Sequence, residues 1–153
     1  MSVRINLDAY PLDQSPDGYG PAMPKKILVI DDNLDSRELI HLHLTTEGYT
    51  VVTASNGQEG LYLAGAEHPD LIITDINMPE LDGLELIRQL RKRPEFATVP
   101  ILVLTAFGRD QMDMAITAGA NRAVNKPAHF DALVDDVREL LAELGRNRPD
   151  EPI

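Results

Sequence analysis

The most informative stretch of this sequence is Ile27-Leu28-Val29-Ile30-Asp31-Asp32, in which four apolar residues end in two adjacent carboxylates. A short apolar run of this kind is typical of a strand buried in a parallel sheet. Three later strand-like runs also lead to a polar side chain: Leu71–Thr74 before Asp75, Ile101–Leu104 before Thr105, and Arg122–Asn125 before Lys126. Because the carboxyl ends of parallel strands lie at one edge of the sheet, where ligands bind, these side chains are expected to surround one site.

The residues at these strand ends suit phosphoryl chemistry. The carboxylates of Asp31, Asp32 and Asp75 would repel one another unless a cation lay among them. Hard oxygen ligands that leave positions for water and a phosphate favour Mg²⁺. Beside the metal, one carboxylate can act as a nucleophile and accept a phosphoryl group. The ion and Lys126 would then neutralise the charge on the transferred oxygens.

Strands alternate with helical stretches five times, which predicts an α/β fold with an open, doubly wound parallel sheet. The expected strands cover residues 26–31, 50–54, 71–75, 100–105 and 122–125, and the expected helices cover 34–47, 57–67, 84–93, 109–118 and 130–144. The last helix carries the clearest apolar stripe, which consists of Phe130, Leu133, Val134, Val137, Leu140, Leu141 and Leu144. Asn33, Asn56 and Asp82-Gly83 are signals for helix starts, and Gly48 and Gly119 for helix ends.

The two ends of the chain differ from its middle in composition. Residues 1–24 contain four prolines and two glycines without sustained periodicity, which favours a disordered or extended tail. Residues 146–153 are polar and contain two prolines, and they are expected to form a frayed terminus. The predicted domain covers residues 25–145.

Composition excludes several classes of function. The 153 residues carry a net charge of −11, which argues against binding nucleic acid through neutralised phosphates. The dense basic run Arg91-Lys92-Arg93 falls at the end of an expected helix, where cations meet the helix dipole favourably. There is no cysteine, so disulfides and thiolate chemistry are excluded. No apolar run approaches a membrane span, and the N-terminus lacks a signal-peptide core, so we expect a cytoplasmic protein.

Taken together, these motifs resemble the receiver domain of two-component response regulators, over about residues 25–145. The matching stretches are Ile27–Asp32, Leu71–Pro79, Asp82-Gly83, Leu104–Ala106 and Asn125-Lys126-Pro127. The resemblance implies a flavodoxin-like fold with five strands in the order 2-1-3-4-5 and five helices.

The resemblance also implies a role for each residue at the strand ends. Asp75 would be the phosphoacceptor, modified by a histidine kinase or a phosphotransfer protein. Asp32 and Asp75 would bind Mg²⁺ directly, Asp31 would bind it through water, and the backbone carbonyl of Asn77 would also contact the metal. Lys126 would pair first with the carboxylate and then with the phosphate.

Thr105 would hydrogen-bond the phosphate, and its movement would repack residues 107–118 into a second arrangement. The sequence departs from the family pattern at one switch position. Receivers commonly carry Tyr or Phe three residues before the lysine, and this chain has Ala123 there. Phe107, two residues after Thr105, is a candidate substitute.

The function expected from these residues is a stand-alone phosphorylation switch, with output through a downstream target protein and without direct nucleic-acid contact or membrane insertion. It is not expected to be an enzyme beyond losing its own phosphate, and a homodimer is left open. One alternative is a scaffold with the receiver fold that does not use phosphate. The other is a phosphatase with an aspartate nucleophile, but such enzymes typically carry a second Asp two residues after the nucleophile, where this chain has Asn77.

Overall fold

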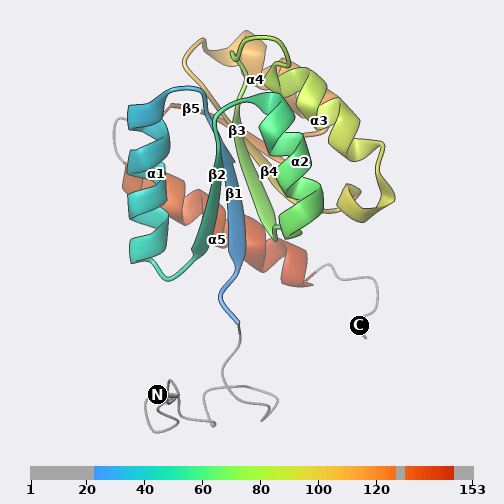
Figure 1. Ribbon diagram of the computed structural model, residues 1–153. Coiled ribbons are helices and arrows are strands. Elements are labelled where there is room, and N and C mark those ends of the chain that lie inside the picture. Colours follow the sequence, from blue (N-terminus) through green and yellow to red (C-terminus); the bar gives the residue numbers. More distant parts are fainter. Residues whose placement is uncertain (1–22, 127–129, 147–153) are drawn as a thin grey trace, which may run out of the picture.

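The computed structural model describes residues 23–126 and 130–146. These residues form a five-stranded parallel sheet in the order β2-β1-β3-β4-β5 with helices packed on both faces (Figure 1). The strands are β1 (Lys26–Ile30), β2 (Thr50–Ala54), β3 (Leu71–Asp75), β4 (Ile101–Thr105) and β5 (Arg122–Asn125). The predicted fold class and strand order are therefore confirmed.

The helices begin and end close to where the sequence predicts. They are α1 (Leu34–Thr46), α2 (Gly57–Glu67), α3 (Gly83–Arg91), α4 (Arg109–Ala118) and α5 (Phe130–Arg146). The expected third helix is shorter at its end, and a separate 3-10 turn follows it over Pro94–Phe96. The last helix continues to Arg146, two residues beyond its expected end and into the segment predicted as a tail.

Side chains cap three of these helices, and the caps at Asn33 and Asn56 are as predicted. The side-chain oxygens of Asn33, Asn56 and Asp82 each accept a hydrogen bond from the backbone N–H three residues further on. Each such bond satisfies one of the free amides of a first helical turn. These caps fix the points at which the chain turns from the sheet edge into α1, α2 and α3.

The core consists of two apolar layers, one on each face of the sheet. On one face, α2, α3 and α4 cover β1, β3 and β4, with Leu86, Ile87, Leu90 and Phe96 among the fully buried side chains. On the other face, α1 and α5 contribute Ile40, Leu44, Leu133 and Val137. The stripe predicted for the last helix is therefore confirmed, because four of its members are buried here: Leu133, Val134, Val137 and Leu140.

The topology places the polar strand ends together. Strand β1 lies between β2 and β3. The chain passes from β1 to β2 on one side, and then returns to β3 on the other side of β1. Ile30 pairs with Thr74, Asp75 with Leu104, and Thr105 with Asn125. The residues that follow these pairs lie along the edge formed by the carboxyl ends of the strands, drawn at the top of Figure 1.

Several expectations concern residues that are not described. Residues 1–22 and 147–153, which hold most of the predicted tails, and Pro127 lie outside the described ranges. Among the described helices, none is long and apolar enough to cross a bilayer.

Candidate functional site

Asp31 follows β1 directly and is buried, with 2% of its surface exposed. Its Oδ1 accepts a hydrogen bond of 2.9 Å from the Asn33 N–H, which turns the chain into α1. Its Oδ2 is buried and lies 3.1 Å from the Lys126 Nζ. The neighbouring Asp32 is exposed. The two adjacent carboxylates therefore differ, one being inside the site and the other at its solvent side.

Asp75 is the last residue of β3 and is 7% exposed. Its Oδ1 accepts hydrogen bonds from the backbone N–H groups of Ile76, at 2.7 Å, and Asn77, at 3.3 Å. Its Oδ2 lies 3.1 Å from the Lys126 Nζ. One oxygen of Asp75 is thus held by the backbone, and the other faces the lysine.

Lys126 follows β5 and joins the two buried carboxylates. Its Nζ lies 3.1 Å from Oδ2 of Asp31 and 3.1 Å from Oδ2 of Asp75, and its backbone N–H donates to the Thr105 carbonyl. Partial burial by itself lowers the pKa of Lys126, but pairing with Asp75 and Asp31 outweighs this effect, so the pKa is raised above its ordinary value. The lysine is therefore a permanent cation of the site at neutral pH.

Thr105 ends β4, and its hydroxyl is fully buried. The hydroxyl donates to the Gln111 Oε1 at 2.7 Å and accepts from the Phe107 N–H at 3.1 Å. Gln111 lies in the first turn of α4, and its side chain also exchanges two hydrogen bonds with the amide of Asn77. A helix on one side of the site is thereby tied to two of the predicted site residues.

The carboxylates form a group that fits a divalent cation. Asp31, Asp32 and Asp75 each offer an oxygen, and these oxygens lie within 4.8 Å of one another. The Lys126 ammonium lies beside two of the three carboxylates, those of Asp31 and Asp75, so the cluster keeps an excess of negative charge that a bound cation would offset. An all-oxygen donor set that is open to solvent at Asp32 suits Mg²⁺, which retains waters and takes few protein ligands.

The structure thus brings together the residues that the sequence analysis selected, while the role of each stays a prediction. Asp31, Asp75 and Lys126 line one site, and Asp32 lies at its mouth. Thr105 is joined to them through the Lys126 backbone. The substitution at Ala123 falls in β5, where the side chain is half-buried. The side chain of Phe107 is 68% exposed. Sequence reasoning missed Gln111, and no local pattern marks it.

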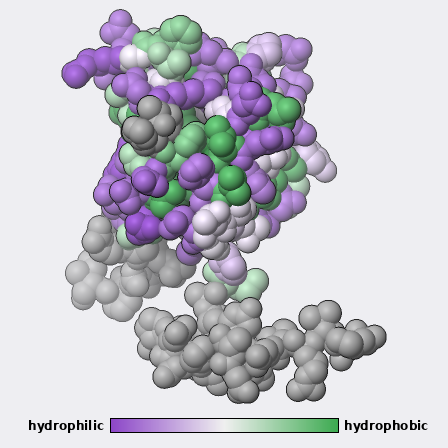
Figure 2. All heavy atoms as spheres, turned by 90° about the vertical axis from the view of Figure 1, so that its left-hand side faces the viewer, coloured by the Kyte–Doolittle hydropathy of each residue, from purple (hydrophilic) through white to green (hydrophobic). Residues whose placement is uncertain are grey.

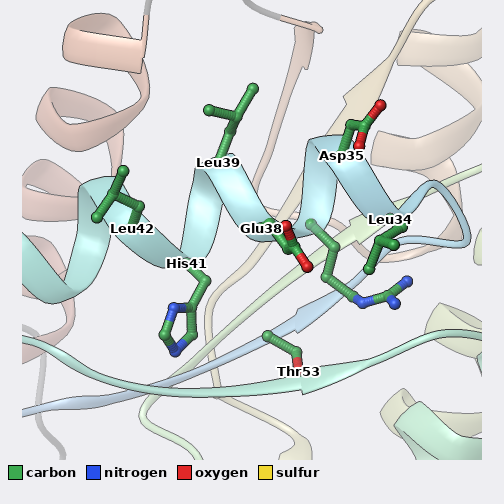
Figure 3. A pocket seen from close by; sticks show the side chains of 8 residues that line it. Leu34, Asp35, Glu38, Leu39, His41, Leu42 and Thr53 are labelled. Carbon is green, nitrogen blue, oxygen red and sulfur yellow. The ribbon is translucent and has the colours of Figure 1, made fainter.

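A shallow groove of about 930 Å³ runs between α1 and the edge strand β2 (Figure 3). Figure 2 shows that apolar side chains gather among hydrophilic ones on the face of the molecule that carries α1. The groove is lined by Leu34, Asp35, Arg37, Glu38, Leu39, His41, Leu42 and Thr53. It includes none of the clustered carboxylates, so the chemistry is assigned to the strand ends and not to this hollow.

Comparison with known proteins identifies the family. The profile of the response regulator receiver domain matches residues 27–138. This chain belongs to the receiver-domain family of response regulators. Response regulator MprA of Mycolicibacterium vanbaalenii is 40% identical over 132 residues, which are 84% of this chain and 54% of that protein. The receiver chain thus spans about half the length of this relative.

Solved receiver structures agree with this membership. A putative response regulator from Chloroflexus aurantiacus superimposes with a TM-score of 0.75 at 36% identity, covering 78% of this chain and 98% of the other. The response regulator TrrA from Thermotoga maritima, solved in complex with Mg²⁺ and beryllium fluoride, gives a TM-score of 0.70 at 39% identity, covering 76% and 98%.

Proposed function

We propose that this receiver accepts a phosphoryl group on Asp75 in a Mg²⁺-dependent reaction, and that the modification switches a protein-interaction surface. The single observation that supports this most strongly is the placement of Lys126 between the buried carboxylates of Asp31 and Asp75. A half-buried ammonium at the ligand-binding edge of a parallel sheet is well placed to meet the oxygens of a transferred phosphoryl group.

The chain's own residues prepare Asp75 for this reaction. The backbone N–H groups of Ile76 and Asn77 hold its Oδ1, so Oδ2, which faces Lys126, is the oxygen that would form a bond to phosphorus. As that bond forms, the bond from phosphorus to the donor breaks, and the nitrogen of a histidine donor keeps the electron pair and takes a proton from solvent, which gives neutral imidazole. Lys126 then pairs with an oxygen of the bound phosphoryl group and stabilises its charge.

Asp31, Asp32 and Asp75 would hold the Mg²⁺ ion, together with the Asn77 backbone carbonyl. When bound, the ion supplies positive charge that shields the three carboxylates from the incoming phosphoryl oxygens. The Thr105 hydroxyl donates a hydrogen bond to one of those oxygens once the group has arrived. The partners proposed are a histidine kinase or phosphotransfer protein as donor and a downstream target protein as recipient of the signal.

Mg²⁺ is expected to stabilise the protein, because it relieves a repulsion among three carboxylates that Lys126 offsets only in part. At a free Mg²⁺ concentration a hundredfold above the dissociation constant, the free energy of unfolding should rise by about 2.7 kcal/mol. Thermal unfolding monitored by circular dichroism measures this rise. Asp32→Asn should remove most of it, since this exposed side chain can change without disturbing the core.

The matched control for the metal experiment is Asp35→Asn, an equally exposed carboxylate in the first turn of α1 that is not in the cluster. This variant should keep the full Mg²⁺ effect. An equal Mg²⁺ effect in Asp32→Asn and wild type would contradict the proposed ligand set.

The proposed function is tested by incubating the protein with phosphoramidate and Mg²⁺ and measuring its intact mass. We expect one phosphate per chain, labile in base as an acyl phosphate is, and none when Mg²⁺ is chelated. A folded wild type that takes up no phosphate would favour a phosphate-independent scaffold. Steady release of phosphate from varied phosphomonoesters would favour a phosphatase.

A further inference from the structure

The side chain of Gln111 makes contacts that no role described so far requires. It lies in α4, yet it bonds Thr105 at the end of β4 and Asn77 in the loop that follows β3. Its Oε1 accepts from both the Thr105 hydroxyl, at 2.7 Å, and the Asn77 Nδ2, at 3.0 Å, and its Nε2 donates to the Asn77 Oδ1 at 3.2 Å. Three elements thus meet at one amide.

Gln111 and a phosphoryl group would compete for the same hydrogen bond, the one that the Thr105 hydroxyl donates. A hydroxyl has a single proton to donate. In the structure that proton goes to Gln111, while the oxygen accepts from the Phe107 N–H. A phosphoryl oxygen is an acceptor without a proton of its own at neutral pH, so Thr105 can serve it only after leaving Gln111.

The hydrogen bonds of Gln111 also help to hold α4 in place, so their loss could let this helix move. Gly108 caps α4 without a side-chain hydrogen bond, and Ala115 is the one fully buried residue within the helix. Met114 and Ile116 are about half exposed. Since the side chains at the start of this helix are not fully buried, the hydrogen bonds of Gln111 contribute to fixing its first turn to the site.

We propose that Gln111 is a positioning residue that holds Thr105 and the first turn of α4 in the unphosphorylated arrangement, and that it releases them when a phosphoryl group on Asp75 accepts the hydrogen bond of the Thr105 hydroxyl in its place. This inference rests on the proposed phosphorylation and assigns its regulation to a named side chain. Departure of the Thr105 hydroxyl also removes one of the bonds that tether α4. Phosphorylation of Asp75 and the position of α4 are thereby coupled through the single hydrogen bond that the Thr105 hydroxyl can donate.

The test uses beryllofluoride with saturating Mg²⁺ as a phosphoryl mimic, titrated into the whole chain and followed by the backbone-amide NMR signals of Ala106 and Phe107. Gln111→Met keeps the length of the side chain and removes its hydrogen bonds. It should raise the affinity for beryllofluoride about twofold to tenfold, the range expected for one net hydrogen bond. An unchanged or weaker affinity in this variant would overturn the inference.

A second comparison separates this role from a general structural one. In a Thr105→Val background there is no hydroxyl proton to hold, so Gln111→Met should change the affinity by less than about twofold. An equal gain in both backgrounds would show that Gln111 does not act through Thr105, and would overturn the proposal. Gln89→Met is the control substitution on α3, where the side chain bonds Glu85, and it should leave the affinity at the wild-type value.

The failure of the proposed function would look different. If the wild type bound no beryllofluoride and took no phosphate from phosphoramidate, both proposals would fail. If the wild type bound the mimic and only the Gln111 comparison failed, phosphorylation of Asp75 would stand without this mechanism of release. Hydrogen exchange of the α4 amides without ligand is an independent readout, and Gln111→Met should speed exchange at Met112, whose N–H bonds the Gly108 carbonyl.

Discussion

Asp75→Asn is expected to abolish phosphate uptake from phosphoramidate, with labelling at least about a hundredfold below wild type. A neutral carboxamide is a far weaker nucleophile than a carboxylate, and it cannot form the acyl phosphate. The fold should survive, because the amide oxygen can still accept from the N–H groups of Ile76 and Asn77 that hold Oδ1. Intact-mass spectrometry of the labelled protein, with circular dichroism as a check on folding, measures both effects.

The control for this substitution is Asp82→Asn, the same chemical change seven residues along the chain. Asp82 caps α3 through its side-chain oxygen, and asparagine caps helices about as well as aspartate does. This variant should therefore fold and take up phosphate like the wild type. If the Asp75→Asn variant still took up phosphate, on Asp31 or on any other side chain, the assignment of Asp75 as phosphoacceptor would be contradicted.

Much of the fold could be predicted because its signals are local. The apolar runs of β1, β3 and β4 are buried along almost their whole length, as expected for strands covered on both faces. Asn33, Asn56 and Asp82 cap the helices that they were predicted to start. These features depend on a few consecutive residues, so the sequence alone carries them.

The proximity of the site residues could also be predicted, since it follows from topology. In a parallel sheet, residues at the carboxyl ends of neighbouring strands must lie close together, and Asp31, Asp75 and Thr105 occupy such ends. The position of Lys126 was anticipated for the same reason. Its simultaneous contact with Asp31 and Asp75 could not be, because it depends on how one long side chain is oriented.

Contacts between distant side chains could not be predicted from the sequence. Gln111 meets Asn77 across 34 positions of the chain, and nothing in its neighbourhood marks it as part of the site. Arg91 was interpreted as part of a basic run at a helix end. It does lie in the last turn of α3, but its guanidinium also binds the carbonyls of Phe96, Val99 and Gly119. Such bonds depend on the packing angle of whole helices, which periodicity does not encode.

Gly83→Ala is expected to destabilise the protein and to slow phosphate uptake, because this position has no room for a side chain. Gly83 is buried at the start of α3, and its N–H donates to the Ile76 carbonyl. An added Cβ would lie 2.1 Å from the carbonyl oxygen of Asp75 and 2.8 Å from the Ile76 Cα. Both atoms belong to the backbone that orients Asp75, the proposed phosphoacceptor, so neither can move without moving the site.

The free energy of unfolding should fall by about 1–3 kcal/mol, as is usual for overpacking. The same shift of the backbone should weaken the N–H bonds to the Asp75 Oδ1 and lower the rate of labelling. Urea unfolding gives the first quantity, and the time course of the intact mass gives the second. If the slope of the unfolding free energy against urea concentration is unchanged, the lower stability comes from the native state.

The matched variant for this test is Gly65→Ala, on α2. There an added Cβ meets only the Arg93 Nη1, at 3.7 Å, which is an ordinary contact. Alanine is the better helix former by up to about 1 kcal/mol, so this variant should be at least as stable as the wild type and should be labelled at the same rate. Opposite signs for the two substitutions would show that the close approach of Gly83 to the Asp75 backbone, and not the loss of glycine as such, sets the outcome. If Gly83→Ala proved as stable as Gly65→Ala and took up phosphate as quickly, the loop after the phosphoacceptor would not depend on this packing.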